Sequence, residues 1–111
     1  MRITDKKRIT VAIMLCCLLP GIGLAEYTVY GPGRKSCGEW LDDRKSFTWV
    51  SDIFWLSGWL SAAGHYGIAD LKTTSSDAMA AYVDTYCQEN PLSDIDAAAM
   101  ALVKSLDQKN E

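Results

Sequence analysis

The residues of this chain best suited to chemistry are its cysteines and its histidine. Cys16 and Cys17 lie in an apolar run near the N-terminus, whereas Cys37 and Cys87 are separated by 50 positions in the body of the sequence. That separation matches no zinc-binding spacing. His65 is the only histidine of the 111 residues, so a Ser–His or Cys–His pair would need a nucleophile that happens to fold against it. We therefore expect no metal site and no cofactor.

Acidic residues are the other candidates for catalysis, and their spacing argues against it. Asp42 and Asp43 are adjacent, so on a helix their side chains diverge by about 100° and cannot act as an acid–base pair. The segment 31–33 is Gly-Pro-Gly, which is a turn and lacks the spacing of a phosphate-binding loop. The sequence therefore predicts that the protein is not an enzyme and has no catalytic residue.

The N-terminal segment has the layout of a secretory signal peptide. Four basic residues between positions 2 and 8 precede an apolar run over 11–19, and the small-residue site Gly23-x-Ala25 follows. The apolar stretch is interrupted by proline and glycine and is marginal in length for crossing a bilayer. We expect residues 1–25 to be cleaved, with export to the periplasm and a domain over residues 26–111. The alternative is an uncleaved N-terminal anchor.

Export determines how the cysteines are expected to pair. Cys16 and Cys17 would leave with the signal peptide, so Cys37 and Cys87 would be the two cysteines of the exported chain. Thiols in an oxidising compartment are expected to pair. A Cys37–Cys87 disulfide would stabilise the domain by about 4 kcal/mol in the chain-entropy model, which is comparable to the whole stability of a domain this small.

The net charge of the expected mature chain argues against nucleic acid as a partner. Residues 1–25 carry four of the 11 Lys and Arg residues and one of the 14 Asp and Glu residues, which leaves seven basic and thirteen acidic residues and a net charge of −6 on residues 26–111. Nucleic acid requires clustered cations and is therefore not an expected partner. Below about pH 3 most carboxylates would be protonated and the net charge would rise to about +9, which favours loosening of a small domain.

Helical periodicity predicts the elements that position these groups. Ser36 and Glu39 have the spacing of a capping box, so a first helix should begin there and run to about residue 45. Trp40 is expected to face inward, and the charged residues 42–45 are expected to face solvent. The lead before this helix, residues 26–35, is expected to be extended and rich in turns.

The longest predicted helix lies within residues 47–67. Apolar residues at helical spacing give it a buried face, and three further aromatic residues, Phe54, Trp55 and Trp59, widen its apolar surface. A membrane-spanning role is disfavoured because Asp52 and several serines interrupt the segment. The three aromatic residues are either core or a surface for clients or partners, because a domain this small has difficulty burying them all.

Two further helices and a tail complete the prediction. Thr74 or Ser76 should open a helix that ends before Pro91, and Ser93 should cap the last helix. A stripe of alanine, leucine and valine residues gives the last helix its buried side, and residues 107–111 should fray. The expected fold is all-α: a small four-helix domain stapled by one disulfide.

Three short segments resemble one family of exported proteins. They are 36–42 (SCGEWLD), 54–60 (FWLSGWL) and 86–91 (YCQENP), and they resemble the periplasmic acid-stress chaperones typified by HdeA and HdeB. The resemblance implies a small helical periplasmic protein with one disulfide, which forms a homodimer near neutral pH and opens at low pH to hold unfolded clients. It also implies that Trp55 and Trp59 belong to the helix used for dimer or client contact.

The chain is also similar to a second family, the Tai/Rap-type periplasmic immunity proteins that neutralise type VI secretion toxins. The similarity lies in size, export, the disulfide and the ending that begins at Asn90-Pro91 and continues with alanines and a Leu-Val pair. The alternatives are therefore an acid-stress chaperone that holds unfolded clients, an immunity protein with a toxin as its partner, and an exported helical protein with another role. None of them requires nucleic acid or stable membrane insertion.

Overall fold

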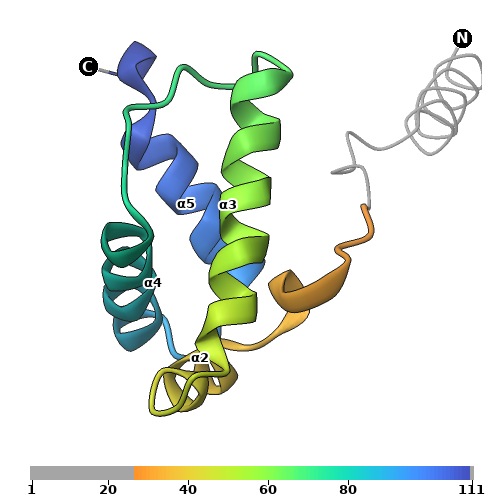
Figure 1. Cartoon of the computed structure of the whole chain (residues 1–111), viewed down its shortest axis with the longest axis vertical. Helices are drawn as coiled ribbons and strands as arrows, with labels where there is room; N and C mark the ends of the chain where they lie inside the picture. The colour runs from red at the N-terminus through yellow and green to blue at the C-terminus, as the bar shows by residue number, and fades with distance from the viewer. Residues whose placement is uncertain (1–26, 111) are drawn as a thin grey trace, which may run out of the picture.

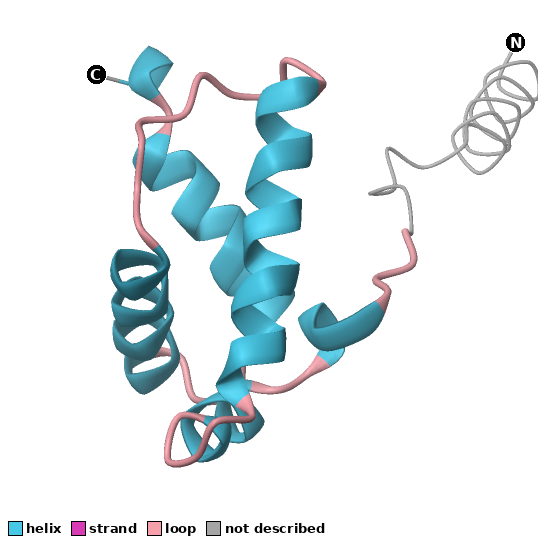
Figure 2. Cartoon of the chain, viewed as in Figure 1, coloured by secondary structure: helices cyan, strands magenta, loops and turns pink. Residues whose placement is uncertain are grey.

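In a computed structural model of the chain, residues 27–110 are described, and the predicted signal peptide over residues 1–25 lies outside them. The described part contains four α-helices and no strand, which confirms the all-α prediction (Figure 1, Figure 2). The α-helices are α2 (Cys37–Asp43), α3 (Trp49–His65), α4 (Ser76–Glu89) and α5 (Ile95–Leu106), and short 3-10 helices lie at η1 (Gly31–Arg34) and η2 (Gln108–Asn110). No helix between residues 27 and 110 combines the length and the apolar character needed to cross a membrane.

The helices pack around α3, which contacts α2, α4, α5 and η1. Figure 1 shows α3 beside α5, with α4 on one side of them, η1 on the other, and α2 across the lower end. Trp40, Leu56, Val83 and Ile95 are fully buried where these elements meet. Small buried residues, such as Ala80 in α4 together with two alanines in α5, allow the helices to approach closely.

The first helix begins as predicted. The Ser36 hydroxyl accepts a hydrogen bond from the Glu39 backbone amide at 3.1 Å, and the Glu39 carboxylate accepts one from the Ser36 amide at 2.7 Å. This reciprocal pair is a complete capping box. It positions Cys37 as the first residue of α2 and Trp40 one turn later, with both side chains buried.

The starts of α4 and α5 lie at or next to the predicted residues. Helix α4 begins at Ser76, one of the two residues predicted to open it, and its N-cap is Ser75. The N-cap of α5 is Asp94 rather than Ser93. In both helices the N-cap side chain accepts a hydrogen bond from the backbone amide three residues later. Each start lies in a run of residues that can all serve as caps, so the sequence pattern could not distinguish between neighbours.

Both ends of the described chain carry structure that the sequence analysis did not predict. The expected irregular lead contains η1, in which Gly33 is buried against α3. The expected frayed tail contains η2, and Asp107 forms an isolated bridge with Leu71. The Asp107 carboxylate also accepts a hydrogen bond from the Asp70 amide at 3.1 Å. The last residues of the described chain therefore brace the connection between α3 and α4.

The disulfide joins the first residue of α2 to the last turn of α4, as predicted. Cys37 and Cys87 are bonded and fully buried, with their Cα atoms 4.9 Å apart. Two backbone hydrogen bonds flank the bridge, from the Cys37 amide to the Ser93 carbonyl and from the Ile95 amide to the Lys35 carbonyl. The start of α2, the end of α4 and the start of α5 are thus tied together at one point.

Candidate functional site

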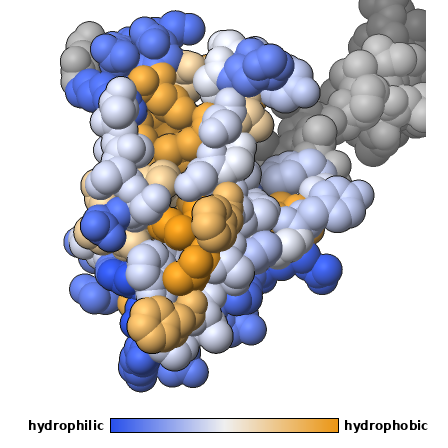
Figure 3. All heavy atoms as spheres, in the orientation of Figure 1, coloured by the Kyte–Doolittle hydropathy of each residue, from blue (hydrophilic) through white to orange (hydrophobic). Residues whose placement is uncertain are grey.

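One side of α3 is apolar and exposed to solvent. Val50 and Phe54 lie there one turn apart, and Phe47 lies in the turn just before the helix. The two phenylalanines are 88% and 72% exposed. Gly58 and Ser61 continue the same line along the helix and are also exposed. None of these five residues, which we call the α3 outer face, carries a charge. Figure 3 shows apolar residues in a band down the middle of the face on which α3 lies in Figure 1.

The three aromatic residues singled out by the sequence do not share this face. Phe54 is on it, but Trp55 and Trp59 are half-buried and pack against the core. The Trp55 indole nitrogen donates a hydrogen bond to the Tyr30 carbonyl at 2.7 Å, and the ring lies so close to Gly33 that a Cβ added there would overlap it. Trp55 therefore holds η1 against α3.

Two residues of the α3 outer face, Phe47 and Val50, were missing from the sequence-based candidates. Val50 lies four positions before Phe54, which is the spacing that places residues on one side of a helix, whereas Phe47 lies in the turn before α3. That spacing was the available signal. Trp55 and Trp59 lie on the adjacent side of the helix, which packs against η1 and the core.

A charge cluster joins α2, α3 and the residue before Ser36. The Lys35 ammonium donates hydrogen bonds to Asp43 and to Asp52, both at 2.8 Å. Asp52 is fully buried in α3, and its second carboxylate oxygen has no hydrogen-bond partner in the described part of the chain. The prediction that residues 42–45 form a solvated face is therefore wrong for Asp43, since a tertiary partner holds it half-buried.

The three groups of this cluster are perturbed in different directions. Burial raises the pKa of the Asp52 carboxyl above its ordinary value. The hydrogen bond from Lys35 lowers the pKa of Asp43, and the hydrogen bonds to Asp43 and Asp52 raise the pKa of the Lys35 ammonium. Asp52 is consequently the first carboxylate of the cluster to take up a proton as the pH falls.

A second ion pair connects α2 to α4. The Arg44 guanidinium donates to both oxygens of Asp84, at 3.0 and 3.2 Å, and the Trp40 indole nitrogen donates to the same carboxylate at 2.8 Å. The guanidinium also stacks on Trp49, 4.6 Å from the ring centroid. The expected solvent exposure of Arg44 is therefore also incorrect, because the side chain closes the lower end of the domain.

The lead is attached to α5 through a third polar contact. The Tyr27 hydroxyl donates to the Asp96 carboxylate at 2.7 Å, and this hydrogen bond raises the pKa of Tyr27. Asp96 is buried, and its other carboxylate oxygen has no partner in the described residues. Together with Trp55, this contact holds residues 27–34 against the domain.

His65 lies at the C-terminal end of α3 and is exposed, with its ring edge-on to Tyr66 at 5.0 Å. Among residues 27–110, no group of three or more His, Cys, Asp and Glu side chains is placed to hold a metal ion. The polar contacts described above instead join the helices to one another and to the segment before α2.

Comparisons of the chain with protein-family models, with curated proteins and with solved structures find no match.

Proposed function

We propose that the protein is an exported, non-enzymatic binding protein of the acid-stress chaperone type, which acts in the periplasm. Its clients are unfolded polypeptides, and the α3 outer face is the surface on which their apolar side chains lie. The observation that carries this proposal is the exposure of Phe54 on α3 and of Phe47 just before it, on a face whose residues carry no charge. An exposed apolar surface of this kind is typical of a protein-binding site.

The chemistry of the face suits a client of variable sequence. Phenylalanine rings offer apolar area without hydrogen-bond donors that would select one partner, and Gly58 and Ser61 leave room for a backbone to approach. The resemblance of segments 36–42, 54–60 and 86–91 to acid-stress chaperones supports the same role.

Protonation of the carboxylates gives a physical reason for client capture and release to depend on pH. The seven basic residues of 26–111 would lose most of their acidic counterparts below about pH 3, so repulsion within the domain would increase. The disulfide would keep the loosened chain connected while more of the apolar interior became accessible.

Light scattering tests the proposal. The oxidised protein is mixed with an aggregation-prone client and acidified to about pH 2–3, where carboxylates are protonated. Wild-type protein should suppress the scattering, whereas Phe54→Ser should lose most of that effect because it removes exposed apolar area from the α3 outer face. Leu92→Ser is the matched control, since Leu92 is fully exposed on the connection between α4 and α5.

The outcomes separate the alternatives. Failure of the wild-type protein to suppress aggregation would exclude the chaperone role. Equal losses in Phe54→Ser and Leu92→Ser would exclude the α3 outer face as the client surface. Tight one-to-one binding of a folded secreted toxin at pH 7, without acid-dependent client protection, would favour the immunity function. Sedimentation of both variants at pH 7 and about pH 2 would show whether a homodimer uses this face.

A further inference from the structure

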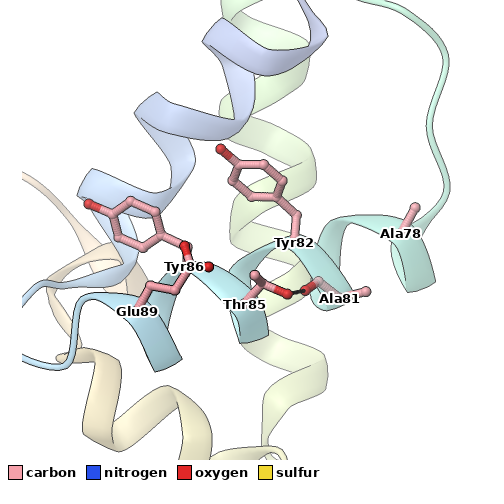
Figure 4. Close-up of a pocket in the computed structure, with 6 residues that line it drawn as sticks. All are labelled: Ala78, Ala81, Tyr82, Thr85, Tyr86 and Glu89. Carbon is pink, nitrogen blue, oxygen red and sulfur yellow. Dashed lines mark hydrogen bonds between the residues drawn. The ribbon is translucent and has the colours of Figure 1, made fainter.

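A groove runs along α4, on a different helix from the proposed client surface. Its volume is about 430 Å³, within the range of binding pockets. The lining residues recur three and four positions apart and therefore form one stripe of the helix: Ala78, Ala81, Tyr82, Thr85, Tyr86 and Glu89. Figure 4 shows Tyr82 and Tyr86 projecting to the same side of α4, with the small residues along the helix beside them.

The groove is held in shape by contacts outside it. The Tyr86 hydroxyl shares a hydrogen bond with the Ser93 hydroxyl at 3.1 Å, which fixes the ring against the end of the α4–α5 connection. Tyr82 is half-buried and packs against the core. A partner would thus meet aromatic surfaces that are already positioned, which lowers the entropy lost on binding.

The charge of the groove is negative. Glu89 is its one charged lining residue, and the Glu89 carboxylate makes no hydrogen bond or ion pair within residues 27–110. The helix α4 contains three acidic residues and no Lys or Arg, and Asp84 is occupied by Arg44. Burial, together with the nearby Tyr86 and Glu89, raises the pKa of Tyr82, which is consistent with a site that disfavours further negative charge.

Two tyrosine rings next to an unpaired carboxylate match the chemistry of a guanidinium group. Arginine stacks on aromatic rings and pairs with a carboxylate through two parallel hydrogen bonds. The three small lining residues leave space for the backbone on either side of such a side chain. We propose that the α4 groove binds an arginine-bearing segment of a partner protein, with the guanidinium against Tyr82 and Tyr86 and paired with Glu89.

Nuclear magnetic resonance titration of the oxidised protein tests this site. The probes are a seven-residue alanine peptide with a central arginine and the same peptide with citrulline, which has a similar shape but no charge. The arginine peptide should cause saturable shifts at amides between residues 78 and 93, and the citrulline peptide should not. Glu89→Gln should weaken arginine-peptide binding by about fivefold or more, as expected for loss of a charge-assisted pair.

Asp42→Asn is the matched control, because it removes one exposed negative charge from α2 while leaving α4 intact. Its binding of the arginine peptide should change by less than about twofold. Equal weakening by the two variants would indicate general charge attraction and overturn the proposal. Equal shifts from both peptides, shifts confined to the α3 outer face, or no saturable binding would overturn it too. The result does not depend on client protection in acid, so the two proposals can fail separately.

Discussion

Lys35 illustrates how a single side chain can hold a small helical domain together. It reaches from the residue before the α2 cap to Asp43 at the end of α2 and to Asp52 in the first turn of α3. The two carboxylates are not equivalent, because Asp52 is fully buried whereas Asp43 retains some contact with water. Burial of the ionised Asp52 opposes folding, while the Lys35–Asp43 pair favours it.

Asp52→Asn should be as stable as the wild type or more stable at pH 7, by about 0–2 kcal/mol. The folded-state pKa of Asp52 lies above its ordinary value of 3.8, so the folded state binds this proton more tightly than the unfolded state. The ionised carboxylate therefore lowers stability at neutral pH, and this penalty disappears as the pH falls through the folded-state pKa. Urea unfolding at a series of pH values measures the difference between the two proteins.

Asp43→Asn is the control with the opposite sign. The hydrogen bond from Lys35 lowers the pKa of Asp43 in the folded state. Ionised Asp43 therefore stabilises the folded state above the unfolded-state pKa, and this stabilisation is lost as the pH falls through the folded-state pKa. This variant should be less stable than the wild type at pH 7 by about 1 kcal/mol. If Asp52→Asn were the more damaging substitution at pH 7, the assignment of opposing roles would be incorrect.

At the scale of the elements, η1 and α3 fit together because Gly33 has no side chain. The Trp55 ring occupies the space that a Cβ would need, and its indole nitrogen holds the Tyr30 carbonyl. Periodicity predicted α3 correctly, but it could not predict η1, since a Gly-Pro-Gly segment has no apolar repeat. The contact that orders η1 comes from a residue more than twenty positions away in the sequence.

Gly33→Ala should lower the free energy of unfolding by about 1–3 kcal/mol, because the new methyl group overlaps the Trp55 ring. Gly58→Ala is the matched substitution within α3. A Cβ at Gly58 meets no atom within 4 Å, so this variant should gain about 0.5–1 kcal/mol from helix propensity. Thermal unfolding of both proteins checks the pair, and a stabilised Gly33→Ala would contradict the packing described.

The N-caps of the helices show a second limit on what sequence patterns can predict. The capping box at Ser36 and Glu39 was predictable because both members of the pair are specific residues. At Ser75 and Asp94 the neighbouring residues are equally able to cap, and tertiary packing decides which one does. The predicted solvent exposure of Asp43 and Arg44 was wrong because their partners, Lys35 and Asp84, lie in other segments.

For the whole molecule, the disulfide is the connection that brings distant segments into one core. It links α2 to α4 beside the backbone hydrogen bonds that attach the start of α5. The sequence predicted this pairing because the expected export and cleavage would leave two cysteines to consider. It left open whether Phe54 lies in the core or on a surface, and it did not predict the α4 groove, because another element could have covered either set of residues.

Reduction of the disulfide, or the single substitution Cys87→Ser, should destabilise the protein by about 4 kcal/mol. The bridge closes a loop with a sequence separation of 50 residues, and its loss increases the conformational freedom of the unfolded chain. Calorimetry with and without reductant should therefore give a much lower Tm for the reduced protein. The double variant Cys37→Ser/Cys87→Ser should be insensitive to reductant, and equal melting of reduced and oxidised wild type would contradict the prediction.

The same bridge makes residues 37–87 a covalent ring, with the segment connecting α3 to α4 lying inside it. A protease that cuts this segment once would open the ring without releasing either piece. The nicked protein would migrate as one species on a denaturing gel until a thiol was added, and then as two. Permanent separation at this position therefore needs two chemical events, one hydrolytic and one reductive.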